Sequence, residues 1–217
     1  METVLIIGAV IGLIVGIIAL ASYMEKKRTE ALTAFAQANG YAMEQDLAGF
    51  RTAMGSFKLF NQGHSRDLRN LMRGNRDDVS VSICDYRYTT GSGKHQQTHN
   101  QTVCVLRSPK LRLPHFFARR QVALFDFLGK VFGGQDINFD EDPEFSKAYV
   151  LQTAGSEDEL RRLFQQPLRS QLTALAPKGV QIEAREDTIV YHLAKRLKPE
   201  QISELVDDAL AVRRSLS

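Results

Sequence analysis

The sequence contains a glycine-rich run that resembles part of a phosphate-binding loop. Residues 91–94 read GSGK and include the Gly-Lys pair with which such loops hold phosphates. A complete motif also needs glycine at the position of Tyr88 and Ser or Thr at the position of His95. The run lies between two predicted antiparallel strands, whereas a phosphate loop joins a strand to a helix. We therefore expect a polar turn here and no nucleotide site.

Two histidines have a spacing that metal sites use. His95 and His99 are four residues apart, as in helices that bind one zinc ion through two histidines. Zinc proteases with this spacing carry Glu after the first histidine, and Gln96 occupies that position here. The segment also has the composition of a glycine-flanked loop. A solvated loop is the expected structure, and we predict no metal site.

An acidic segment begins like a calcium-binding loop. Asp136, Asn138 and Asp140 alternate along the chain as the first ligands of an EF-hand do. Glu141 replaces the glycine that the loop requires, and Lys147 replaces its bidentate Glu. An EF-hand is therefore excluded. A looser cation site over residues 136–144 is the alternative to an acidic surface segment.

The two cysteines, Cys84 and Cys104, are too few for a disulfide framework. Both fall in predicted strands and no histidine is tied to them by sequence, so we interpret them as small core residues rather than nucleophiles. If their strands pair around a loop centred on Lys94, the two cysteines lie directly opposite each other on one face. Mild oxidation would then link them within one chain.

The elements that position these residues follow from alternation and capping. Residues 78–89 alternate apolar and polar side chains and give the clearest strand signal. Other strands are predicted at 66–73, 101–107, 115–120, 148–152, 180–183 and 188–193, the first two forming an antiparallel meander with 78–89. Helices are predicted at 122–132, from the capping box of Ser156 and Glu159 to Leu175, and from Pro199 to Leu216. The predicted fold class is α+β, a mainly antiparallel sheet with packed helices.

The N-terminal segment is long and apolar enough to cross a bilayer. Val4 to Tyr23 is a run of 20 residues without a charge, and a helix of this length spans about 30 Å, the thickness of the hydrocarbon layer. Residues 1–3 would form a short external N-terminus, 24–40 a helical stalk that ends at Gly40, and 41–217 the folded domain. A cleaved signal peptide is the alternative, because residues 19–21 (ALA) resemble a cleavage site. No Lys or Arg precedes the apolar run, which favours an uncleaved anchor.

The charges beside the apolar run predict its orientation. Lys26, Lys27 and Arg28 follow it directly, and by the positive-inside rule this flank stays in the cytoplasm while the N-terminus goes outside. We predict a single-pass protein of the plasma (inner) membrane with a cytoplasmic domain.

Three glycines suggest how the anchor meets other helices. Gly8, Gly12 and Gly16 repeat every four residues and fall close to one helix face, where another backbone can approach. We predict association with a membrane-protein partner or with a second copy of the chain.

The charge of the chain is uneven. Residues 51–130 contain 14 Lys and Arg against 5 Asp and Glu, whereas the whole chain has a net charge of only +3. This basic middle could face anionic lipid headgroups, with Arg119 and Arg120 as candidate contacts, although solvated strand faces are the simpler interpretation. We expect no nucleic-acid partner, no cofactor and no catalytic set recognisable from sequence.

Two stretches carry a resemblance to known proteins. Residues 85–94 (DYRYTTGSGK), followed by HNQTV at 99–103, resemble uncharacterised bacterial single-pass membrane proteins, and the likeness continues through 135–151 (QDINFDEDPEFSKAYVL). It covers about half the chain and implies a membrane-tethered bacterial domain. It assigns no functional residue.

These observations predict a membrane-tethered accessory or interaction module that binds a protein partner at the cytoplasmic membrane face. Two alternatives stay open: an enzyme that acts on a membrane-proximal substrate through a site assembled from distant residues, and an anionic-lipid-binding domain. A deep pocket with convergent ionisable groups would favour the enzyme.

Overall fold

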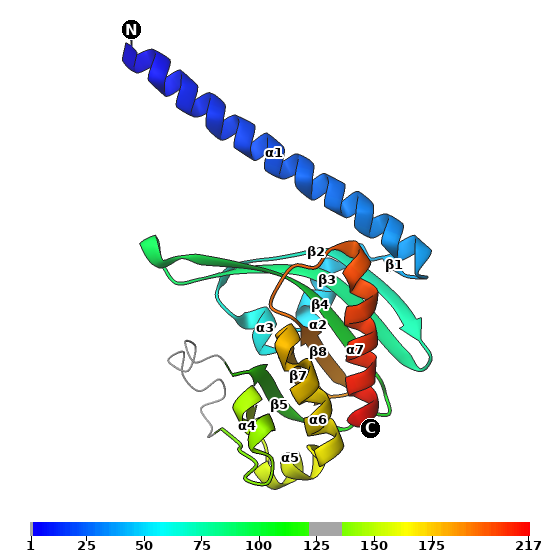
Figure 1. Ribbon diagram of the computed structural model, residues 1–217. Coiled ribbons are helices and arrows are strands. Elements are labelled where there is room, and N and C mark those ends of the chain that lie inside the picture. Colours follow the sequence, from blue (N-terminus) through cyan, green and yellow to red (C-terminus); the bar gives the residue numbers. More distant parts are fainter. Residues whose placement is uncertain (1, 122–135) are drawn as a thin grey trace. The chain divides into compact units, whose positions relative to one another are not determined.

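The computed structural model describes residues 2–121 and 136–217, which form two compact units, 1–40 and 41–217 (Figure 1). The first unit is one helix, α1 (Glu2–Ala38). Its most apolar 18-residue window has a mean hydropathy of 2.5 and is not buried, so α1 is long and apolar enough to cross a membrane. Gly40 follows with φ of 73°, the left-handed conformation that ends helices.

The second unit is built on an eight-stranded sheet in the order β1-β2-β3-β4-β8-β7-β5-β6, and all of its described pairings are antiparallel. The strands are β1 (Ala42–Met43), β2 (His64–Arg76), β3 (Val79–Thr90), β4 (Gln97–Arg107), β5 (Leu113–Arg120), β6 (Tyr149–Thr153), β7 (Gln181–Glu186) and β8 (Thr188–His192). Each predicted strand overlaps one of these, and the predicted α+β class is confirmed.

Helices connect and cover the strands. They are α2 (Leu47–Ala53), α3 (Lys58–Asn61), α4 (Pro143–Ala148), α5 (Glu157–Leu163), α6 (Gln166–Leu175) and α7 (Ile202–Ser215), with 3₁₀ turns at Gly93–His95, Ala176–Lys178 and Pro199–Gln201. The helix predicted at 156–175 is two helices, because Pro167 opens a new first turn in α6. The helix predicted at 122–132 lies outside the described residues.

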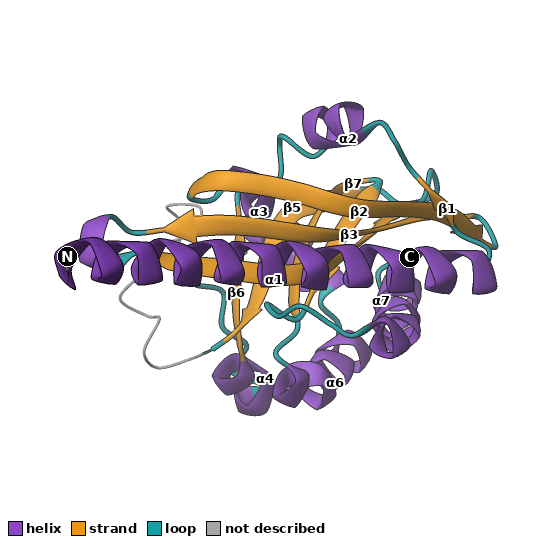
Figure 2. Cartoon of the chain, turned by 90° about the horizontal axis from the view of Figure 1, so that it is seen from above, coloured by secondary structure: helices purple, strands orange, loops and turns teal. Residues whose placement is uncertain are grey.

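Helices lie on both faces of the sheet (Figure 2), and buried side chains form a core beneath them on each face. Helices α2 and α3 cover one face, where Phe50, Phe60 and Tyr86 pack with Cys84 and Val103. Helices α6 and α7 cover the other face. The buried residues of these two helices are Leu168, Arg169, Leu172, Ile202, Leu205, Val206, Ala209 and Val212.

The predicted register of the β3–β4 hairpin is wrong by one residue. Cys84 pairs with Val103, and Cys104 pairs with Ile83. Directly opposed residues share a face and neighbours along a strand alternate, so the two cysteines lie on opposite faces of the sheet. The hairpin is centred between Gly93 and Lys94 rather than on Lys94, which shifts every pair by one.

Candidate functional site

The glycine-rich run and its histidines lie at the tip of the β3–β4 hairpin, where residues 91–98 are exposed. Strands flank this tip on both sides, as the antiparallel interpretation required. His99 stacks on the Tyr88 ring, with 4.7 Å between centroids, and its Nε2 lies 2.9 Å from the Thr90 hydroxyl. Partial burial lowers the pKa of His99. No three potential metal ligands gather anywhere in the described part of the chain.

The cysteines are buried on opposite faces and both are free thiols. Burial raises the pKa of Cys104 to about 12 and that of Cys84 well above its ordinary value. Cysteine acts as a nucleophile in its deprotonated thiolate form, and a raised pKa disfavours that form. The geometry therefore matches the prediction of small core residues and contradicts that of an oxidisable pair.

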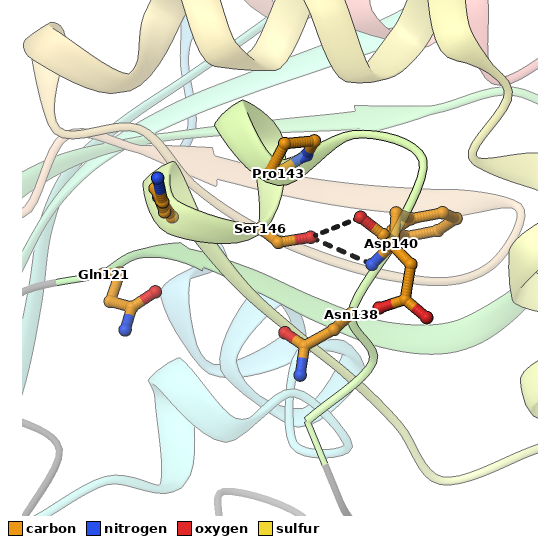
Figure 3. A pocket seen from close by; sticks show the side chains of 7 residues that line it. Gln121, Asn138, Asp140, Pro143 and Ser146 are labelled. Carbon is orange, nitrogen blue, oxygen red and sulfur yellow. Dashed lines mark hydrogen bonds between the residues drawn. The ribbon is translucent and has the colours of Figure 1, made fainter.

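The acidic segment contributes to a surface pocket of about 330 Å³ beside α4 (Figure 3). Asn138, Asp140 and Lys147 contribute to its lining. The Ser146 hydroxyl is bonded to both backbone polar groups of Phe139, at 2.9 Å from the nitrogen and 3.2 Å from the oxygen, and so fixes the pocket wall. Asp136 belongs to the same acidic segment but is not among the lining residues of the pocket. Its carboxylate accepts a hydrogen bond from the side-chain amide of Gln152 at 2.7 Å.

This pocket offers hydrogen-bonding groups of both kinds and one side chain of each charge. It can hold a small polar molecule, but its serine already serves the backbone. Asp136 and Asp140 are not brought together around a common point with a third carboxylate. The arrangement therefore gives no support to the looser cation site.

A buried carboxylate that sequence reasoning missed lies on the sheet face below α3. The Glu183 side chain is 2% exposed. Its carboxylate accepts from the backbone N–H groups of Lys58, at 2.9 Å, and Leu59, at 3.4 Å, and lies 3.0 Å from His115 Nε2. The Glu183 carboxylate therefore caps the N-terminus of α3, because the side chain of Phe57, the N-cap residue, makes no capping hydrogen bond.

Lys58 completes this cluster. Its ammonium lies 5.7 Å from the centre of the Phe117 ring, and burial lowers its pKa, against the attraction of Glu183. No sequence signal marked Glu183, because alternation along the predicted strand 180–183 puts it on the side of Gln181, away from Val180 and Ile182. The cluster ties α3 to β5 and β7, so its evident role is to position elements.

The two arginines proposed as lipid contacts are separated by the sheet. Arg119 pairs with Gln181 and Val150, and Arg120 is the next residue along β5. Neighbouring strand residues point to opposite faces, so the two side chains do not form one patch. Arg120 is exposed and Arg119 is partly buried.

The predicted anchor residues lie on α1. Gly8, Gly12 and Gly16 are exposed, and a Cβ added to any of them would meet nothing within 4 Å. At 100° per residue they span about 80° of the helix circumference, which makes a continuous open strip. Lys27 lies 3.8 Å from Glu30 and 5.8 Å from the centre of the Tyr23 ring, at the end of the apolar run. Lys26 is exposed and Arg28 partly buried.

The described residues thus define a protein with one exposed apolar N-terminal helix and an α+β domain on an antiparallel sheet. No family model matches the chain, and no curated protein matches it. Among solved structures it resembles the crystal structure of the mycobacterial trehalose monomycolate transport factor A, TtfA, with a TM-score of 0.53 and 12% sequence identity. The likeness covers 87% of this chain and 96% of that one, and at this identity it concerns the fold alone.

Proposed function

We propose that this protein is a membrane-tethered accessory module that binds an integral membrane protein at the cytoplasmic face of a bacterial inner membrane. The observation that carries the proposal is α1, a helix whose described apolar residues between Ile6 and Met24 are exposed and which carries an open glycine strip. A bilayer removes such side chains from water, and the strip admits a second helix at close range.

The comparison and the pocket agree with this proposal. The solved structure of similar fold is that of a transport factor. We propose by analogy that this chain assists a membrane protein in a transport process. Among its described lining residues, the pocket beside α4 has a serine already bound to the backbone and no pair of buried ionisable groups, which favours a binding module over an enzyme.

The glycine strip provides the test. Gly12→Ile adds a branched side chain where a partner helix would lie, and Ala21→Ile adds the same bulk on the opposite side of α1. The full chain is purified from native membranes after mild crosslinking, and the recovered integral membrane protein is quantified. We expect recovery to fall at least fivefold with Gly12→Ile and to stay unchanged with Ala21→Ile. Equal recovery from both variants would contradict the proposal.

A further inference from the structure

The outer edge of β4 is only partly paired. β8 pairs with β4 from Val103 to Arg107, whereas residues 97–101 pair with β3 alone among the described strands. Figure 1 shows this hairpin projecting away from the helices of its unit. We name the outer side of residues 97–101 the hairpin edge.

The backbone groups that face outward at the hairpin edge can be assigned. The Thr102 N–H donates to the Lys195 carbonyl at 3.1 Å, so Thr102 presents its backbone away from β3. The β3–β4 register is unbroken from Ser80 to Thr90, and outward-facing residues alternate along an antiparallel strand. Asn100 and Thr98 therefore each present one N–H and one C=O outward, and both residues are exposed.

The hairpin edge lacks the features that block strand addition elsewhere in the sheet. β2 is interrupted by two irregularities, with Ser65 and Asn70 at φ of 49° and 52°, and the short strand β1 covers part of it. On β6 the Leu151 carbonyl accepts from Ile137 at 2.8 Å. Residues 97–101 (QTHNQ) contain neither proline nor lysine, and no bulge interrupts their pairing with β3.

The charges around the hairpin edge identify a suitable occupant. Arg87 lies directly opposite Asn100 and is exposed, as is Lys94 at the tip. Residues 87–101 contain no Asp or Glu. The acid of β3 nearest to this edge, Asp85, is buried and its carboxylate is held by Thr102 and Arg196. On the next strand, β2, Asp67 is held by Arg69 at 2.6 Å and only loosely by Arg87 at 3.5 Å. A second copy of the hairpin would bring like charges together, whereas an acidic segment would complement them.

The alternating backbone donors and acceptors of the hairpin edge favour a peptide over a lipid headgroup as its ligand. The phosphate of a lipid headgroup accepts hydrogen bonds from N–H groups, but a headgroup does not present donors and acceptors in the alternating spacing of the N–H and C=O groups of Thr98 and Asn100. An extended peptide supplies both kinds of group in the same spacing.

We propose that the hairpin edge binds an extended acidic segment of a protein partner as an added β-strand. The inference rests on the proposed function, because it names the surface through which the tethered domain engages its partner. Backbone pairing fixes the segment along the edge, and Arg87 and Lys94 select for acidic side chains.

A photo-crosslinking experiment on the full chain in native membranes tests the inference. Benzoylphenylalanine replaces Gln97 at the hairpin edge, or Ala9 beside the glycine strip, and the crosslinked peptides are sequenced by mass spectrometry. Asn100→Pro removes one outward N–H without breaking a bond to β3, while Asn100→Ala keeps that N–H. Lys94→Glu reverses one charge at an exposed turn and serves as a variant that leaves the strand intact. Thermal unfolding of each variant verifies its fold.

We expect the Gln97 probe to link to an acidic segment of another protein. The yield should fall at least tenfold in Asn100→Pro and several-fold in Lys94→Glu, and it should be unchanged in Asn100→Ala. Crosslinks from Gln97 to lipid only, to a second copy only, or equally in all variants would overturn the inference. If Ala9 links to an integral membrane protein and Gln97 links to no protein, the hairpin-edge proposal fails and the proposed function stands. If neither position links to a protein, both fail.

Discussion

At the scale of single residues, the buried Glu183 carboxylate is the strongest test of how α3 is held. Replacing it by Gln leaves one oxygen and puts an NH₂ group against the N–H donors of Lys58 and Leu59. Losing charge-assisted bonds at a buried site costs about 1–3 kcal/mol. We expect Glu183→Gln to lower the free energy of unfolding by this amount in urea titrations.

Glu186 provides a matched control on the same strand. It is exposed and bonded only to the neighbouring Arg185, at 3.2 Å. Exposed ion pairs contribute little, so Glu186→Gln should change the free energy of unfolding by less than about 0.5 kcal/mol. A Glu183→Gln protein as stable as the Glu186→Gln protein would mean that Glu183 does not hold α3.

His192 makes stability depend on pH. Burial lowers its pKa to about 4, and its Nδ1 accepts from the Ala194 N–H at 3.2 Å, as a neutral imidazole does. The unfolded histidine has a pKa of about 6.5, so between these values the unfolded state binds more protons and stability falls as the pH falls. The loss approaches about 3 kcal/mol near pH 4, where the folded histidine also begins to titrate.

The measurement is a series of urea titrations of the wild-type chain and His192→Gln from pH 7.5 to 4.5. The variant keeps an acceptor for the Ala194 N–H and loses the titrating group. We expect its stability curve to be flatter than the wild-type curve over this window. Parallel curves would show that another group causes the acid sensitivity.

At the scale of elements, local patterns predicted most of the strands. The alternation at 78–89 predicted β3 (Val79–Thr90) to within one residue at each end, and the turn around residues 185–187 predicted the β7–β8 hairpin. The pairings β4–β8 and β5–β7 join segments far apart in the chain, and no local pattern encodes them. Helices α2 and α3 were missed because seven and four residues are too short to establish a helical period.

The hairpin register shows why positions are harder to predict than elements. The loop between β3 and β4 contains a 3₁₀ turn, Gly93–His95, and its even number of residues puts the centre of the hairpin between two residues. A shift of one residue moves a side chain to the other face. This single ambiguity separated the cysteines. The Glu183 cluster could not be assembled from sequence for another reason, because it joins α3, β5 and β7, which are far apart in the chain.

The final helix gives a prediction at this scale. Leu205 of α7 is 2% exposed, and Leu→Ala at buried sites costs about 2–5 kcal/mol. We expect Leu205→Ala to lower the free energy of unfolding within this range, measured by urea titration. Ser203→Ala, on the exposed side of the same helix, should change it by less than about 0.5 kcal/mol. A small effect of Leu205→Ala would mean that α7 contributes little to the second core.

At the scale of the whole molecule, two units with opposite solvent preferences share one chain. The large exposed apolar side chains in the described part of the chain all belong to α1, where they lie between Ile6 and Met24. In the described residues of the domain, 41–121 and 136–217, the large apolar side chains are buried or partly buried. The proposed tether assigns each unit to the medium that its surface fits.

The direction in which α1 crosses the membrane is the last prediction, and it depends on three charges. Lys26, Lys27 and Arg28 follow the apolar run, and Met1, Glu2 and Thr3 precede it. We expect a C-terminal alkaline phosphatase fusion to be inactive and a C-terminal fluorescent protein to be bright, because the positive-inside rule predicts that the basic flank stays in the cytoplasm. Replacing the three basic residues with Gln and changing Glu2 and Thr3 to Lys moves the positive charge to the other flank. This variant should raise phosphatase activity and dim the fluorescence. An active phosphatase fusion on the unchanged chain would contradict the cytoplasmic orientation, and a product shortened by removal of the N-terminal segment would identify α1 as a signal sequence.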